Sequence, residues 1–252
     1  MHVDVIVLAG GRSSRLDGVA KASLVVGSTT LLQRAVEAGR GAVAVGEGGS
    51  PGTGGRVVVV GPDDETTALG DTLRDPRASS CAVLRTREAP PFGGPAAGIA
   101  AGLAALSGPP APAAAGPAAA RAPLVAVIAC DHPRVDRALP AVLAAVLRDG
   151  ADESIDAWAA RGRDDRLQPL LAVYRRAALD RRVAAVRRER AHGLDGASMR
   201  TLTEGLTFAP VPVPTVDTAD IDTWADAARF DATPPTASVA AGDHPTHSGG
   251  AR

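Results

Sequence analysis

The sequence predicts an α/β domain in which buried strands and helices alternate around a mostly parallel sheet. Three apolar runs carry this prediction: Val5–Leu8, Val57–Val60 and Leu124–Ala129. Each is rich in β-branched residues and ends at a glycine or a polar turn, as buried strands of parallel sheets do. Between them lie segments with apolar residues at helical spacing, such as 31–37 and 96–106.

The composition is that of a soluble globular protein with one main domain. The chain has 252 residues, 45% of them hydrophobic and 22% charged, and its formal net charge is −1. This balance gives no electrostatic reason to expect a nucleic acid or membrane partner. We find no secretory signal or transmembrane run, and Cys81 and Cys130 form neither a disulfide framework nor a zinc motif. The expected location is therefore the cytoplasm.

One domain is expected over residues 1–232, followed by a disordered tail at 233–252. Two flexible segments are expected inside the domain, at about 40–55 and at 108–122. Both are rich in glycine, alanine or proline and cannot bury an apolar face. The tail lacks apolar periodicity as well.

The first strand leads into a glycine loop that is suited to phosphate. The sequence from Leu8 reads L-A-G-G-R-S-S-R, and Lys21 follows. Gly10 and Gly11 let the backbone approach a ligand and direct N–H groups toward it. Arg15 and Lys21 supply the positive charge that phosphate oxygens need. The loop is neither a Walker loop nor G-x-G-x-x-G, and a tight βα turn would also explain its glycines.

A carboxylate follows the third apolar run. Asp131 comes directly after Leu124–Ala129 and Cys130, and open α/β sheets bind ligands at the carboxyl ends of their strands. A carboxylate there can hold Mg²⁺, a hard cation that prefers oxygen ligands. Asp131 could instead cap the turn before Pro133. Cys130 is expected to be a small buried side chain, and His132 is expected to be structural or solvated rather than a ligand.

The second half of the domain predicts a hairpin, a basic helix and an edge strand. Segments 157–160 and 167–174 flank a polar turn and predict a hairpin or an antiparallel addition to the sheet. If 167–174 is simply a core strand, the Tyr174 hydroxyl is expected to point outward. Segment 175–190 is a helix rich in arginine, which forms either a solvated face or a surface for an anionic ligand. Prolines in 208–213 place that strand at an edge.

Four strings, in this order, resemble the MobA-like family of molybdenum cofactor guanylyltransferases. They are L-A-G-G-R-S-S-R with the lysine after it, G-G-P-A-A-G-I-A-A-G-L, Q-P-L-L-A-V-Y-R and D-I-D-T, and they begin at Leu8, Gly93, Gln168 and Asp220. The resemblance implies a Rossmann-like, three-layer α/β/α fold of the nucleotide-diphospho-sugar transferase type, with a mostly parallel sheet and a small antiparallel addition. The small residues of the second string would serve either the nucleotide or close packing of a helix on the sheet.

The resemblance also implies a reaction that depends on Mg²⁺. GMP would pass from GTP to the phosphate of molybdenum-molybdopterin, and pyrophosphate would leave. Transient contact with molybdenum cofactor insertion proteins is a further expectation.

The family motifs assign a role to each matching residue. Catalysis falls to Arg15, Lys21 and Asp131. Asp222 joins Asp131 as a metal ligand, with Asp220 further out, although helix capping would also explain Asp222. The residues implied for nucleotide binding are Leu8, Ala9, Gly10, Gly11, Lys21, Glu88, Gly94 and Asp131.

Departures from the family leave the substrates open. Ala20 stands where the family usually has an aspartate directly before the lysine. Glu88 is the carboxylate that could accept from the N1–H and N2 amine of guanine. The alternatives are a CTP-dependent molybdopterin cytidylyltransferase, transfer to another phosphate such as phospholactate or a sugar phosphate, and a non-catalytic nucleotide-binding partner in cofactor insertion.

Overall fold

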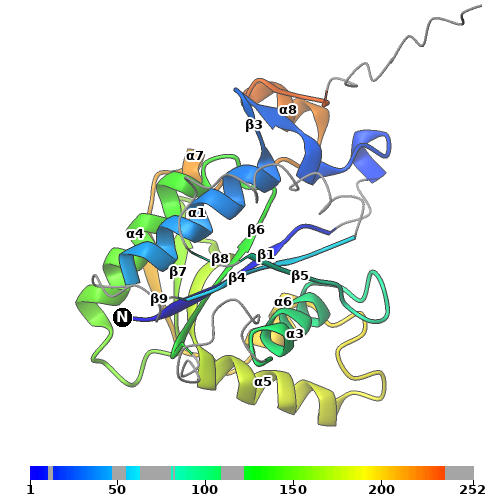
Figure 1. The fold of residues 1–252 in the computed structure, drawn as a ribbon. Coiled ribbons are helices and arrows are strands. Elements are labelled where there is room, and N and C mark those ends of the chain that lie inside the picture. Colours follow the sequence, from blue (N-terminus) through cyan, green and yellow to red (C-terminus); the bar gives the residue numbers. More distant parts are fainter. Residues whose placement is uncertain (11–13, 47–54, 63–80, 82, 109–121, 236–252) are drawn as a thin grey trace, which may run out of the picture.

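The computed structural model is built on a seven-stranded sheet (Figure 1). It describes residues 1–10, 14–46, 55–62, 81, 83–108 and 122–235. The strand order is β5-β4-β1-β6-β8-β7-β9. In chain order these strands are β1 (Val3–Leu8), β4 (Val57–Val60), β5 (Val83–Thr86), β6 (Leu124–Ala129), β7 (Ala157–Arg161), β8 (Leu167–Arg175) and β9 (Phe208–Pro212).

The sheet is mostly parallel, as the apolar runs predicted. β5, β4, β1 and β6 are parallel neighbours, whereas β8 is antiparallel to both β6 and β7. The predicted hairpin is therefore confirmed as β7 and β8. The strand β9 lies at the sheet edge, parallel to β7, as expected for a strand in which two residues are prolines without an N–H donor.

Helices cover both faces of the sheet (Figure 1). On one face lie α1 (Leu31–Gly46) and α4 (Val135–Asp149), and on the other lie α3 (Pro95–Ala105), α5 (Arg176–Glu189) and α6 (Met199–Thr203). Two hydrophobic cores result, the first between the sheet and α1 and α4, the second between the sheet and α3, α5 and α6. Side chains alternate along β1, so Val5 and Val7 lie in the first core and Ile6 lies in the second. This arrangement confirms the three-layer α/β/α fold.

Close helix packing explains two small residues of α3. A Cβ on Gly102 would lie 2.8 Å from the Ile6 side chain, and one on Gly98 would lie 3.2 Å from Leu8 Cδ2. α3 can therefore approach β1 only because these positions lack a side chain. At the start of the helix, Pro95 occupies the first turn and Gly94 precedes it at a φ of 87°.

A smaller unit joins the carboxyl edge of the main sheet. It contains the three-stranded antiparallel sheet β10-β2-β3, formed by β2 (Val25–Val26), β3 (Thr29–Thr30) and β10 (Ala232–Thr233), together with the short helices η1 (Ser14–Leu16), η2 (Lys21–Ser23) and α8 (Trp224–Arg229). Its buried residues form a third core, the small core: Leu16, Leu24, Leu31, Ile221, Ala227 and Ala232. The segment that follows β1 thus meets the last described elements of the domain in this unit.

Two details correct the sequence interpretation. α1 continues to Gly46, so residues 40–46 are helical, and only 47–54 of that expected flexible segment fall outside the described residues. Thr233 pairs with Val25, so the fold extends beyond 232. Residues 109–121 and 236–252 also lie outside the described part of the chain.

Two side chains near β8 differ from expectation. Tyr174 is fully buried and donates its hydroxyl to the carbonyl of Pro169 at 2.6 Å, so the hydroxyl points inward, and burial raises its pKa. Arg176, at 4% exposure, donates to Asp4 Oδ2 at 3.1 Å. The basic segment is therefore not one solvated face, because Arg176 lies inside the fold. None of the described helices has the length and hydropathy of a membrane span.

Candidate active site

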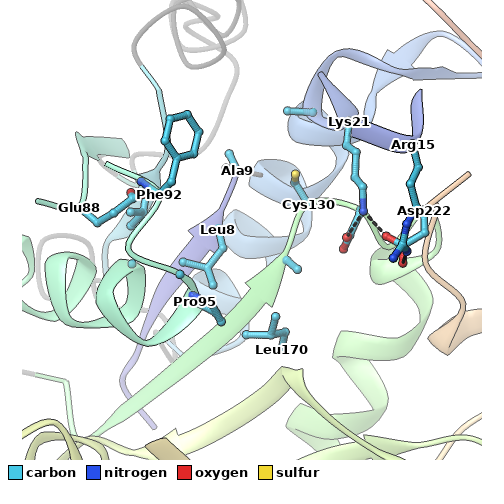
Figure 2. Close-up of a pocket in the computed structure, with 17 residues that line it drawn as sticks. Leu8, Ala9, Arg15, Lys21, Glu88, Phe92, Pro95, Cys130, Leu170 and Asp222 are labelled. Carbon is cyan, nitrogen blue, oxygen red and sulfur yellow. Dashed lines mark hydrogen bonds and ion pairs between the residues drawn. The ribbon is translucent and has the colours of Figure 1, made fainter. Parts of the chain in front are cut away.

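A cavity of about 470 Å³ opens at the carboxyl ends of the central strands (Figure 2). Its walls come from the ends of β1, β4 and β6, the first turn of α3, the two short helices after β1, and the loop before α8. The residues that line it are Leu8, Ala9, Gly10, Arg15, Lys21, Ala22, Val60, Glu88, Phe92, Gly94, Pro95, Gly98, Ala129, Cys130, Asp131, Leu170 and Asp222. Open α/β sheets place their ligands at this edge.

Parallel pairing brings the two main motifs together. Leu8 of β1 pairs with Ala129 of β6, and Cys130 N donates to the Leu8 carbonyl at 2.9 Å. The chain segments that follow these two strands therefore leave the sheet side by side. Gly10 and Asp131 consequently face the same cavity.

Lys21 bridges two carboxylates. Its Nζ lies 3.3 Å from Asp131 Oδ2 and also pairs with Asp222 Oδ1. Arg15 Nη1 lies 3.6 Å from the other oxygen of Asp222. Burial lowers the pKa of Lys21, but the charge of Asp131 and the hydrogen bond to Asp222 outweigh burial, so the pKa is raised above 10.5. Lys21 is therefore a fixed cation at neutral pH.

Two contacts hold the segment that contains Asp220 and Asp222 beside Asp131. Ile221 N donates to the Asp131 carbonyl at 3.0 Å, and the Nδ1 atom of buried His132 lies 3.4 Å from the Ala219 carbonyl. These contacts hold residues 219–222 against the end of β6. The predicted structural role of His132 agrees with this position.

Helix capping is the task of Thr223 rather than of Asp222. The Thr223 hydroxyl accepts from Asp226 N at 3.2 Å, and Asp226 Oδ2 accepts from Thr223 N at 3.0 Å, which completes a capping box at the start of α8. The carboxylate of Asp222 is directed to Lys21 instead.

Three carboxylates could together hold a cation. Ligand oxygens of Asp131, Asp220 and Asp222 all lie within 4.8 Å of one another. Asp220 therefore lies near the other two, but it is exposed and does not line the cavity, so its place further out stays a prediction. Hard oxygen donors from three aspartates fit Mg²⁺. Any cation held there would share the carboxylates with Lys21.

The other side of the cavity is formed by the loop before α3. Glu88 Oε1 accepts from Phe92 N at 3.1 Å, and both residues line the cavity. Figure 2 shows them across the cavity from Lys21, Arg15 and Asp222. Sequence reasoning did not select Phe92, although it directly precedes the glycine pair of the second string.

The predicted site residues converge on this cavity. Leu8, Ala9, Gly10, Arg15, Lys21, Glu88, Gly94, Asp131 and Asp222 all line it. Gly11 lies outside the described residues. Cys130 is buried in the cavity wall, as expected for a small apolar side chain. The individual roles assigned to these residues remain predictions.

Solved structures share the fold. They include Rv0371c from Mycobacterium tuberculosis, at a TM-score of 0.51 and 21% identity over 91% of this chain and 97% of that chain. Another is 4-diphosphocytidyl-2C-methyl-D-erythritol synthase from Anaerococcus prevotii, at a TM-score of 0.58 and 12% identity over 91% of this chain and 96% of that chain. A nucleoside-diphosphate-sugar pyrophosphorylase from Vibrio cholerae has a TM-score of 0.57 and 13% identity over 90% of this chain and 98% of that chain. At these identities the likenesses establish the fold alone.

Family and fold together define a nucleotidyltransferase with a Rossmann-like α/β/α fold. The model of one family, the MobA-like NTP transferase domain, matches residues 5–200. The chain belongs to this family. No curated protein matches the chain significantly.

Proposed function

We propose that the protein transfers GMP from GTP to the phosphate of molybdenum-molybdopterin, with Mg²⁺ as cofactor and pyrophosphate as leaving group. One observation carries the proposal: Lys21 and Arg15 meet a set of aspartates at one side of a cavity whose other side holds Glu88. Cations suit the phosphates, and a carboxylate suits the donor edge of guanine. The cavity thus offers complementary groups at both ends of GTP.

Phosphate charge is the main obstacle in such a displacement. Reaction at the α-phosphorus needs in-line positioning and neutralisation of negative charge more than proton transfer. Lys21 meets this need because its raised pKa keeps it protonated at neutral pH. Arg15 adds a second cation, whose side chain is 72% exposed and pairs with Asp222 at 3.6 Å.

The aspartates would hold the metal cofactor. Asp131 and Asp222 are the proposed ligands, and the proximity of Asp220 supports it as a third. When bound, Mg²⁺ would offset charge on the α-phosphate and on the attacking acceptor phosphate. The same carboxylates hold Lys21 in place at this side of the cavity.

The nucleotide is proposed to enter along the ends of β1 and α3. Leu8, Ala9 and Gly10 line this approach, and Gly94 leaves the approach to α3 uncovered by a side chain. Glu88 would accept hydrogen bonds from guanine. Its carboxylate is held in position by the N–H of Phe92 at 3.1 Å.

Pyrophosphate release measured with each nucleoside triphosphate in turn, with molybdopterin and Mg²⁺ present, tests the proposal. GTP alone should support turnover. Turnover with CTP alone would replace the guanylyl assignment by a cytidylyl one. Turnover only with a sugar phosphate or phospholactate as acceptor would replace molybdopterin. Nucleotide binding without any turnover would leave a non-catalytic partner in cofactor insertion.

A further inference from the structure

Phe92 has an unusual position among the aromatic residues of the chain. The sequence holds six: three phenylalanines, two tryptophans and one tyrosine. Trp158 and Tyr174 are fully buried, and Phe208, Trp224 and Phe230 pack against the cores. Phe92 is 52% exposed and is the aromatic residue among the described residues that line the cavity.

The backbone at Phe92 is held in a conformation that favours glycine. Its φ is +61°, in the left-handed region, where a side chain with a Cβ is strained. The Glu88 carboxylate secures this turn by accepting from Phe92 N at 3.1 Å. Glycine at position 92 would adopt the turn without strain, so the ring is retained at a conformational cost. Backbone strain of this kind concentrates where side chains contact ligands.

The position of the ring indicates what it contacts. Figure 2 shows Phe92 beside Glu88, across the cavity from Lys21 and Arg15. If the phosphates of a nucleotide lie at the cations, its base extends toward the side that holds Phe92. Two base-recognising groups meet there: a carboxylate that can bind the edge of the base and a π face that can bind its plane.

We propose that Phe92 is a stacking platform for the nucleobase of the bound nucleotide and favours a purine. This inference rests on the proposed nucleotide binding and deepens it by naming a residue for base selection. A purine offers the larger face to the ring, whereas Glu88 distinguishes among purines by their donors.

Equilibrium binding to the full chain tests the platform. GTP, CTP and inorganic tripolyphosphate, each with Mg²⁺, are titrated onto the wild type, Phe92→Gly and Phe92→Trp by calorimetry. Phe92→Gly should weaken GTP binding about tenfold, since stacking on an aromatic side chain contributes about this factor per base. The loss should be smaller for CTP and absent for tripolyphosphate. Phe92→Trp should bind GTP at least as well as the wild type, with quenched fluorescence of the introduced indole.

The glycine variant keeps the test independent of folding. It relieves the strained φ, so its thermal midpoint should equal or exceed that of the wild type. Leu147→Ala, which removes an exposed apolar side chain of 61% exposure from α4 outside the cavity, is the matched control and should bind like the wild type.

The outcomes separate the two proposals. Equal GTP binding by the wild type and Phe92→Gly overturns the platform and leaves the nucleotidyltransferase assignment standing. An equal loss for GTP and tripolyphosphate also overturns it, because the ring would then act on the cavity and not on the base. A wild type that binds no nucleoside triphosphate overturns both.

Discussion

Trp224 donates its indole N–H to Asp17 Oδ2 at 2.8 Å, across 207 positions of sequence. Asp17 lies in the turn between Arg15 and Lys21, at a φ of +51°, and Trp224 begins α8 directly after the Asp222 string. Neither residue lines the cavity. The bond therefore joins, from outside, the segment that carries the cations to the segment that carries two of the carboxylates.

Breaking this bond should loosen the site without removing any group from it. Trp224→Phe keeps a ring against the small core but loses the donor, and we expect a loss of about 1 kcal/mol in unfolding free energy. The KM for the nucleotide should rise more than kcat falls. A double-mutant cycle with Asp17→Ala, followed by urea unfolding, measures the coupling. Strictly additive losses would show that the two side chains do not act together.

Asp131→Asn should nearly abolish turnover and leave the fold intact. The amide keeps the shape of the carboxylate but removes its charge, and the rate should fall by about a hundredfold or more. Mn²⁺ binding, followed by electron paramagnetic resonance, should weaken in parallel. Asp136→Asn is the control, because Asp136 pairs with Arg34 at 3.8 Å and does not line the cavity. A near-normal rate for Asp131→Asn would remove the metal role.

Lys21 predicts a particular dependence on pH. Its pKa is raised, so its cation and the ion pairs with Asp131 and Asp222 are fully present below 10.5 and are lost only as the pH rises through the higher folded value. The turnover rate should show no loss from Lys21 between neutral pH and about 9. Lys21→Met should lower kcat by about a hundredfold at every pH in that range. A wild-type rate that declines near pH 8, with a decline missing in Lys21→Arg, would contradict the raised pKa.

Two glycines should respond in opposite ways to alanine. At Gly102 the new Cβ would meet Ile6 at 2.8 Å, and Gly102→Ala should cost about 1–3 kcal/mol of stability by overpacking. At Gly41, inside α1, a Cβ would meet nothing within 4 Å, so Gly41→Ala should stabilise by about 0.5–1 kcal/mol. Thermal unfolding of the two variants checks both signs. Equal effects would mean that α3 does not need its close approach to β1.

The main sheet was predictable because its strands are signalled locally. Runs such as Val57–Val60 and Leu124–Ala129 are apolar without interruption, which only a strand buried on both faces tolerates. The small sheet had no such signal. β2, β3 and β10 have two residues each, too few for an alternating pattern, and β10 reaches β2 only through the folded chain.

Site residues that belong to a local motif could be predicted from the sequence. Those that only tertiary contacts bring to the site could not. Asp131 follows from the end of a strong strand. Asp220 joins it because Ile221 N bonds to the Asp131 carbonyl, a contact with no local pattern. Phe92 lines the cavity with its backbone at a left-handed φ, a conformation that the local sequence does not predict for a phenylalanine. Tyr174 turns inward because the Pro169 carbonyl offers an acceptor.

The ion pair of Asp4 and Arg176 lies at the amino end of β1, away from the cavity. Besides Asp4, the Arg176 guanidinium donates to the Leu103 carbonyl at 3.2 Å and to Ser107 Oγ at 3.0 Å, near the end of α3. A single side chain thus fixes how far α3 can slide along β1. Since the opposite ends of both elements line the cavity, this buried charge helps to fix the spacing of the groups proposed to bind the nucleotide, from a place that the proposed ligand would not touch.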